Sequence, residues 1–114
     1  MRWTRGGRPG CIFGSVASYT VVLSKEPSGW YSAVCPAMPG AISQGESHDA
    51  AIVNIVEAMA GWYEVSSERG LAPLKETSEL VGQKVSEVLG FLAEEGWPLL
   101  VETAVVHLPA VVAA

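Results

Sequence analysis

The sequence predicts a small α+β domain of two layers, in which helices pack on an antiparallel sheet. Runs rich in β-branched residues at 17–26 and 99–108 are typical of strands. The stretches 48–68 and 77–95 repeat apolar residues every three or four positions, which is the helical period. A tight turn at 26–29 makes the first two strands antiparallel. The expected order is strand, strand, strand, helix, helix, strand.

Glycine and proline separate the first three strands. Gly29 follows Pro27 and Ser28 in the turn that leads into a second strand at 30–34. Neither Pro36 nor Pro39 can donate to a ladder, so they end this strand, and Gly40 completes the corner. A third short strand is then expected at 41–44.

The first helix is expected over 48–68. Gly45 allows the chain to turn into it, Ser47 is placed to accept as its N-cap, and Ala50 keeps its first turn slim. The residues expected to face the sheet are Ile52, Ile55, Val56, Met59 and Tyr63. Gly61 lowers helix stability by about 1 kcal/mol relative to Ala, which indicates close packing or a break at this point.

The second helix is expected to begin near Thr77 or Ser78 and to end at 95. Its core stripe is Val81, Val85, Val88, Leu89 and Leu92. Leu80 and Phe91 widen the apolar surface, which favours burial between two layers or against another subunit. The last strand, 99–108, is apolar on both faces, so we expect it to be covered on both sides or paired across a subunit boundary.

The length of 114 residues is sufficient for one domain with one core. We expect a flexible N-terminal extension at 1–14, the domain at 15–108 and a tail at 109–114. The two cysteines, Cys11 and Cys35, lack a C-x-x-C spacing, and a reducing cytoplasmic setting is the simplest expectation. No apolar run is long enough to span a membrane.

The net charge of −5 hides an asymmetry along the chain. Three of the seven basic residues are Arg2, Arg5 and Arg8. The remainder holds four basic residues against all twelve acidic ones, a net charge of −8. Such a body repels a phosphate backbone, so no direct DNA binding is expected, and a basic protein partner suits it better.

Three acids of the first helix are candidates for contact with such a partner. Glu57, Glu64 and Glu68 fall together on a flank away from the apolar stripe. The alternative is that this flank is an ordinary solvated helix face.

No catalytic constellation is present in the sequence. Cys35 with His48 or His107 as a base lacks any surrounding motif, and a cysteine is commonly a small buried apolar residue. His48 and Asp49 are adjacent rather than one helical turn apart, which disfavours a metal site. Phosphate-binding glycine loops and inward-facing acid pairs are also missing. We therefore expect neither an enzyme nor a cofactor.

Residues 19–73 resemble the HicB-like antitoxin family. The resemblance lies in Gly-Trp-Tyr, then Pro-x-x-Pro-Gly, then Gly-x-Ser-x-x-x-Ala, in this order along the chain. The residues of these motifs are Gly29, Trp30, Tyr31, Pro36, Pro39, Gly40, Gly45, Ser47 and Ala50.

The resemblance implies a partial RNase H-like fold that lacks the catalytic acids. Family members bind and neutralise HicA, a small basic toxin that cleaves mRNA, so a HicA-like partner is expected. Many members also carry a DNA-binding C-terminal segment. Here the second predicted helix and the strand at 99–108 occupy its place with few basic residues.

Two alternatives remain open beside the antitoxin hypothesis. The chain could be an orphan oligomeric interaction module or small-ligand module with no toxin partner, or, less favoured, a hydrolase or thiol enzyme. For the antitoxin and for the orphan module, we expect a homo-oligomer, either a dimer or a tetramer, that forms through strand edges or the second helix.

Overall fold

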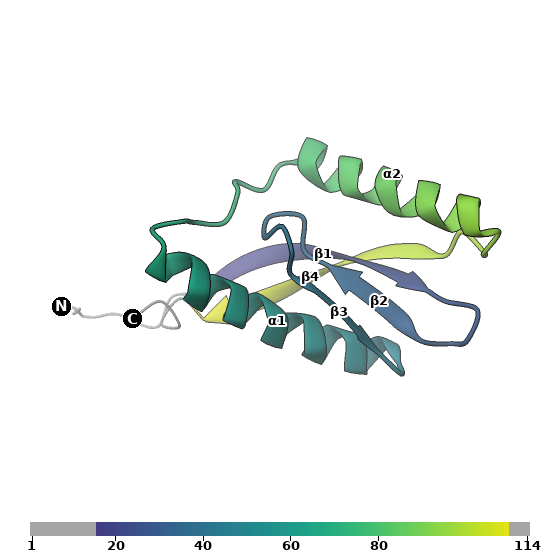
Figure 1. Cartoon of the computed structure of the whole chain (residues 1–114), viewed down its shortest axis with the longest axis horizontal. Helices are drawn as coiled ribbons and strands as arrows, with labels where there is room; N and C mark the ends of the chain where they lie inside the picture. Colours follow the sequence, from purple (N-terminus) through teal and green to yellow (C-terminus); the bar gives the residue numbers. More distant parts are fainter. Residues whose placement is uncertain (1–15, 110–114) are drawn as a thin grey trace.

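The computed structural model describes residues 16–109 and shows one antiparallel sheet with two helices (Figure 1). In chain order the elements are β1 (Val16–Lys25), β2 (Tyr31–Val34), β3 (Ile42–Gly45), α1 (His48–Glu68), α2 (Ser78–Glu95) and β4 (Val101–Pro109). The strands lie in the order β3-β2-β1-β4. The α+β class and the predicted element order are confirmed. The extension expected at 1–14 and residues 110–114 lie outside the described part of the chain.

Strand boundaries differ from the predicted ones by one or two residues. The backbone groups next to the strands form hydrogen bonds within the turns instead of within the sheet. The Glu26 N–H donates to the Trp30 carbonyl at 2.8 Å, which leaves both residues in the hairpin loop. The Leu100 N–H donates to the Pro98 carbonyl at 2.9 Å, so β4 begins at Val101 rather than at residue 99. Pro109, expected in the tail, is the last residue of β4.

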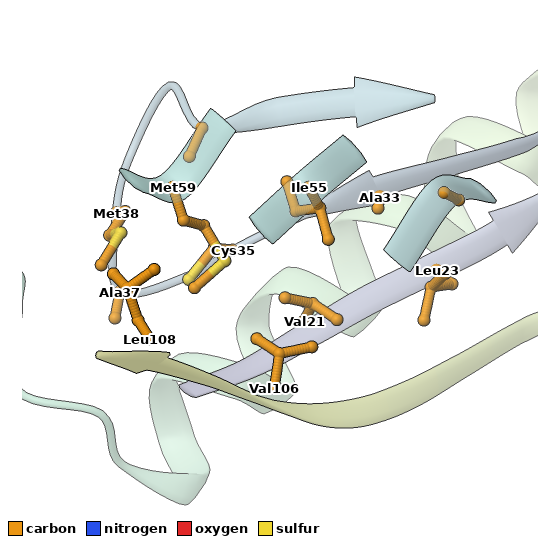
Figure 2. Packing of buried hydrophobic residues seen from close by; sticks show 12 residues of the cluster. Val21, Leu23, Ala33, Cys35, Ala37, Met38, Ile55, Met59, Val106 and Leu108 are labelled. Carbon is orange, nitrogen blue, oxygen red and sulfur yellow. The ribbon is translucent and has the colours of Figure 1, made fainter. Parts of the chain in front are cut away.

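The hydrophobic core lies between α1 and one face of the sheet. Its buried residues are Val21, Leu23, Ala33, Cys35, Ala37, Met38, Ala41, Ala51, Ile55, Met59, Val106 and Leu108. Figure 2 shows Ile55 and Met59 of α1 on the side of the strands that carries these residues. Alternation along β1 sends Val22 to the opposite face, where α2 lies across the sheet.

The buried side of α1 is centred slightly away from the predicted stripe. Ala51, Ile55 and Met59 are fully buried, whereas the predicted Ile52, Val56 and Tyr63 are half-buried at the margin of the core. Neither a break nor close packing occurs at Gly61. The helix continues through this residue, and a Cβ built there would meet nothing within 4 Å.

Helix α2 covers the second face of the sheet with one narrow side. Leu92 is its one buried residue, and the other predicted stripe residues, Val81, Val85, Val88 and Leu89, are half-buried. Phe91 is 51% exposed. The Thr77 hydroxyl accepts from the Leu80 N–H at 3.1 Å, so Thr77 is the N-cap. Within residues 16–109, no helix is both long and apolar enough to span a bilayer.

Candidate functional site

The outward face of α1 carries four acidic residues. Its acids are Asp49, Glu57, Glu64 and Glu68, and all four are exposed. At 100° per residue they lie directly opposite the buried side that includes Ile55. No lysine or arginine occurs within α1. The structure therefore brings the three acids predicted for partner contact together, and it adds Asp49 to them.

An apolar side chain lies among these acidic residues. Val53 lies between Asp49 and Glu57 on the same face and is 58% exposed. Charged residues around an exposed aliphatic residue resemble the rim and centre of a protein-binding surface. We call Asp49, Val53, Glu57, Glu64 and Glu68 the acidic face of α1.

Gly45 is needed for a close approach to α1 rather than for a left-handed backbone conformation. It pairs with Tyr31 as the last residue of β3, and it is absent from the glycines with positive φ. A Cβ at this position would lie 2.5 Å from the Ala51 nitrogen and 2.9 Å from the Ala50 Cβ. The first turn of α1 thus rests directly on β3, and it needs a small residue at both Gly45 and Ala50.

The N-terminus of α1 is capped as the sequence predicts. The Ser47 hydroxyl accepts from the Ala50 N–H at 3.1 Å. Gly29 and Gly40 adopt φ values of 98° and 97°, so the hairpin and the corner each require a residue that tolerates the left-handed region. These four residues shape the backbone that presents the acidic face of α1.

The remaining motif residues serve different purposes. Trp30 is 41% exposed beside the hairpin loop. Pro36 is buried, and the Pro39 carbonyl accepts from the Trp62 indole N–H at 2.8 Å, which ties the corner to α1. Tyr31 packs edge-on against the His48 ring with their centroids 5.7 Å apart. These contacts of the motif residues contribute to the fold around α1.

The residues tested as a thiol centre are separated by their environments. Cys35 is fully buried, and burial raises the pKa of its thiol, which disfavours the reactive thiolate. His48 contacts Glu102, and the His107 Nδ1 lies 3.0 Å from the Ser18 hydroxyl. Between residues 16 and 109, no hydrogen bond links Cys35 to either histidine.

The Ser18–His107 pair was not found from the sequence, because the two residues are 89 positions apart. They are direct cross-strand partners in β1 and β4, and this register alone explains their contact. Within the described range no group of three His, Cys, Asp or Glu residues could hold a metal ion.

A hollow lies on the face of the sheet that α2 only partly covers. Its volume is about 470 Å³. The apolar lining residues include Val22, Val34, Val88, Phe91, Leu92 and Trp97, and the polar ones include Ser24, Glu26, Ser32, Lys84 and Glu87. Phe91 and Trp97 meet edge to face with centroids 5.7 Å apart. Glu26 accepts from the Ser32 hydroxyl at 2.9 Å. We call this hollow the α2 cavity.

Comparison with known sequences places these features in a family. The chain is 48% identical over 44 residues to a UPF0150 protein of Synechocystis sp., a match that covers 39% of this chain and 56%, or about half, of that relative. It is 39% identical over 46 residues to a UPF0150 protein of Thermoplasma acidophilum, covering 40% of this chain and 67% of that relative. No family model matches the sequence.

Comparison with solved structures agrees with this placement. The N-terminal domain of Burkholderia pseudomallei antitoxin HicB superposes with a TM-score of 0.53 and 27% identity, covering 79% of this chain and 95% of that domain. The fold is thus that of a HicB-like α+β domain, which confirms the resemblance seen in the motifs. The chain belongs to the UPF0150 family, whose members are HicB-like.

Proposed function

We propose that this protein is a cytoplasmic antitoxin that binds and neutralises a small basic, RNA-cleaving toxin of the HicA kind by stoichiometric contact. The observation that carries the proposal is the acidic face of α1, on a fold shared with an antitoxin domain. The family relationship supports the overall role, and the distribution of charge supports the choice of this surface.

The charges of this face match the expected partner. A toxin that grips RNA must present lysine and arginine side chains to the phosphates. Helix α1 presents Asp49, Glu57, Glu64 and Glu68 without a lysine or arginine among them. Opposite charge accelerates association and fixes orientation, while Val53 supplies an apolar contact that can be desolvated. The same charges disfavour direct binding of DNA.

The test compares two double charge reversals that alter the net charge equally. Glu57→Lys with Glu64→Lys changes the acidic face, whereas Glu94→Lys with Glu95→Lys changes exposed acids at the end of α2. Binding of a purified small basic toxin of the HicA kind, such as the product of an adjacent gene, is measured by calorimetry at low and high salt. We expect the first pair to weaken binding by at least roughly tenfold and the second pair to have little effect.

Two results would contradict the proposal, one for the role and one for the surface. If the neighbouring product is toxic and its toxicity is unchanged when this protein is co-expressed, the antitoxin role is wrong. If the complex forms but both charge reversals weaken it equally, the role stands and the assignment to the acidic face of α1 is wrong.

A second candidate function is binding of a small ligand, and the α2 cavity favours it. Its volume of about 470 Å³ falls in the range of small-molecule sites, and few polar groups line an apolar interior. The lining carries two acids, Glu26 and Glu87, and one base, Lys84, so its net charge is negative. A ligand with an aromatic or aliphatic amine would suit this charge. NMR shifts confined to Val34, Val88 and Phe91 in a screen of such amines would support this function, and their absence would contradict it.

A further inference from the structure

Strand β4 forms one edge of the sheet in the described part of the chain. It spans Val101–Pro109 and pairs along its length with β1. The strand order β3-β2-β1-β4 leaves its other side without a neighbouring strand among residues 16–109 (Figure 1). An edge of this length is a template for another strand unless the protein blocks it.

The hydrogen bonds show which groups of β4 point outward. The Leu100 carbonyl accepts from the Lys25 N–H at 3.2 Å, so even-numbered residues of this segment direct their backbone groups to β1. The outward N–H and C=O groups are those of Val101, Thr103, Val105 and His107. The backbone groups of β1 alternate in the same way. The Thr20 N–H points away from β4 and donates to Glu76.

The side chains do not block this edge. Glu102 is the one acidic residue in β4, and its carboxylate is engaged by His48. The strand has no lysine or interior proline, and Val105 is 63% exposed. The body of the chain is acidic, but β4 carries only one acidic residue, so two copies can meet along this strand with little charge repulsion.

We propose that a second copy of this chain pairs with β4 in antiparallel orientation, on a two-fold axis at Ala104, and makes a continuous eight-stranded sheet. In this register Val101 faces the partner's His107, and Thr103 faces the partner's Val105. Every outward backbone group of these residues is then hydrogen-bonded. Two β-branched pairs of Thr103 with Val105 form, and Glu102 faces the partner's Val106 rather than a second carboxylate.

The axis itself is compatible with the side chains. Ala104 would face its own copy as a non-hydrogen-bonded pair, where the Cα atoms approach to about 4.5 Å and a small side chain is easily accommodated. A strand pairing with itself is symmetric, so it closes at two copies instead of propagating. This proposal is independent of the antitoxin role.

The first test uses two valines of similar exposure. Val105→Lys places a charge on the proposed interface, and Val53→Lys does the same on α1, where Val53 is 58% exposed. By light scattering at about 100 µM, where mass action favours association, we expect twice the 12.0 kDa chain mass for the wild type and Val53→Lys. Val105→Lys is expected to be monomeric. A monomeric wild type or a dimeric Val105→Lys overturns the proposal.

The second test probes the register. In a Cys11→Ser background, where buried Cys35 is unreactive, Ala104→Cys should form a covalent dimer under mild oxidation, because the two Cα atoms lie within disulfide range. Val53→Cys in the same background is expected to stay uncrosslinked. Absence of the Ala104→Cys crosslink, or equal crosslinking of both variants, overturns the two-fold axis at Ala104.

Discussion

The side chains of His48 and Glu102 meet at 2.5 Å although they are 54 residues apart in the sequence. The contact joins the first residue of α1 to β4, the edge strand of the sheet. Tyr31 of β2 stands edge-on against the same imidazole. This contact gives α1 an attachment to the sheet that is separate from its apolar side.

The pair predicts a pH-dependent contribution to stability. The hydrogen bond to Glu102 raises the pKa of His48 above its usual range, and Asp49 adds to the effect. Because the folded-state pKa lies above the unfolded one, the contribution is complete below the unfolded pKa of about 6.5 and is lost as pH rises through the folded pKa. Glu102→Gln should reduce the advantage of mildly acidic conditions in thermal unfolding.

NMR titration of the His48 ring gives the direct measurement. Its midpoint should fall in Glu102→Gln. An identical His48 midpoint in both proteins would show that the ion pair does not form in solution.

The same substitution at two glycines should have opposite effects. Gly45→Ala forces a Cβ against the backbone of the first turn of α1, and it should lower the free energy of unfolding by roughly 1–3 kcal/mol. Gly61→Ala adds a methyl group in open space within the same helix and should raise it by about 0.5–1 kcal/mol. Urea denaturation measures both, and equal effects would contradict the close approach at Gly45.

Glu76 should anchor the connection between the two helices. Its carboxylate accepts from the Thr20 N–H at 2.6 Å and from the Thr20 hydroxyl at 2.8 Å. The Thr20 N–H lies on β1 beyond the reach of β2, whose pairing begins at Val22. Glu76→Ala is expected to lower the free energy of unfolding by about 1–2 kcal/mol, because charged hydrogen bonds at an exposed site contribute modestly.

Glu94→Ala is the matched control for this prediction. Glu94 is exposed on α2, and its carboxylate has no hydrogen bond with a residue in the described range. Hydrogen exchange should show faster exchange of the Thr20 amide in Glu76→Ala alone. Unchanged protection of that amide would mean that another group satisfies it.

Among the residues of α2, Leu92 should contribute most to the free energy that holds this helix on the sheet. It is 1% exposed, whereas its neighbour Phe91 is 51% exposed. Leu92→Ala is expected to cost roughly 2–5 kcal/mol in the free energy of unfolding, and Phe91→Ala clearly less. If thermal unfolding shows the larger loss for Phe91→Ala, then α2 is held by its outer side, and a partner surface covers it in solution.

Local sequence patterns predicted the bounds of the helices and strands more accurately than they predicted how these elements pack together. The bounds of α1 agree with the predicted helix because Ser47 caps it and Gly70 ends it with a φ of 75°. The strand ends were less accurate, because they depend on turn hydrogen bonds such as Glu26 to Trp30. The steric reason for a glycine at position 45 was not predicted, because a single sequence does not reveal a close approach between a strand and a helix.

The candidate site was predictable only in part. The acids Glu57, Glu64 and Glu68 follow from helical periodicity, and their exposure agrees with it. Their grouping with Asp49 and Val53 depends on the true orientation of α1, which is set by Ala51 and Ile55 against the sheet. The α2 cavity and the Ser18–His107 pair required the strand order and register, and these come from contacts between distant residues.

By itself, the sequence determined the α+β class, the order of elements and the acidic charge of the body, because these depend on composition and local spacing. The family was indicated by the resemblance of the motifs between residues 19 and 73. The tertiary structure decided that α1 and α2 lie on opposite faces, that Gly45 receives the first turn of α1, and that β4 is left as an open edge. These features arise from long-range pairing, as between β1 and β4, whose energy is distributed over many residues.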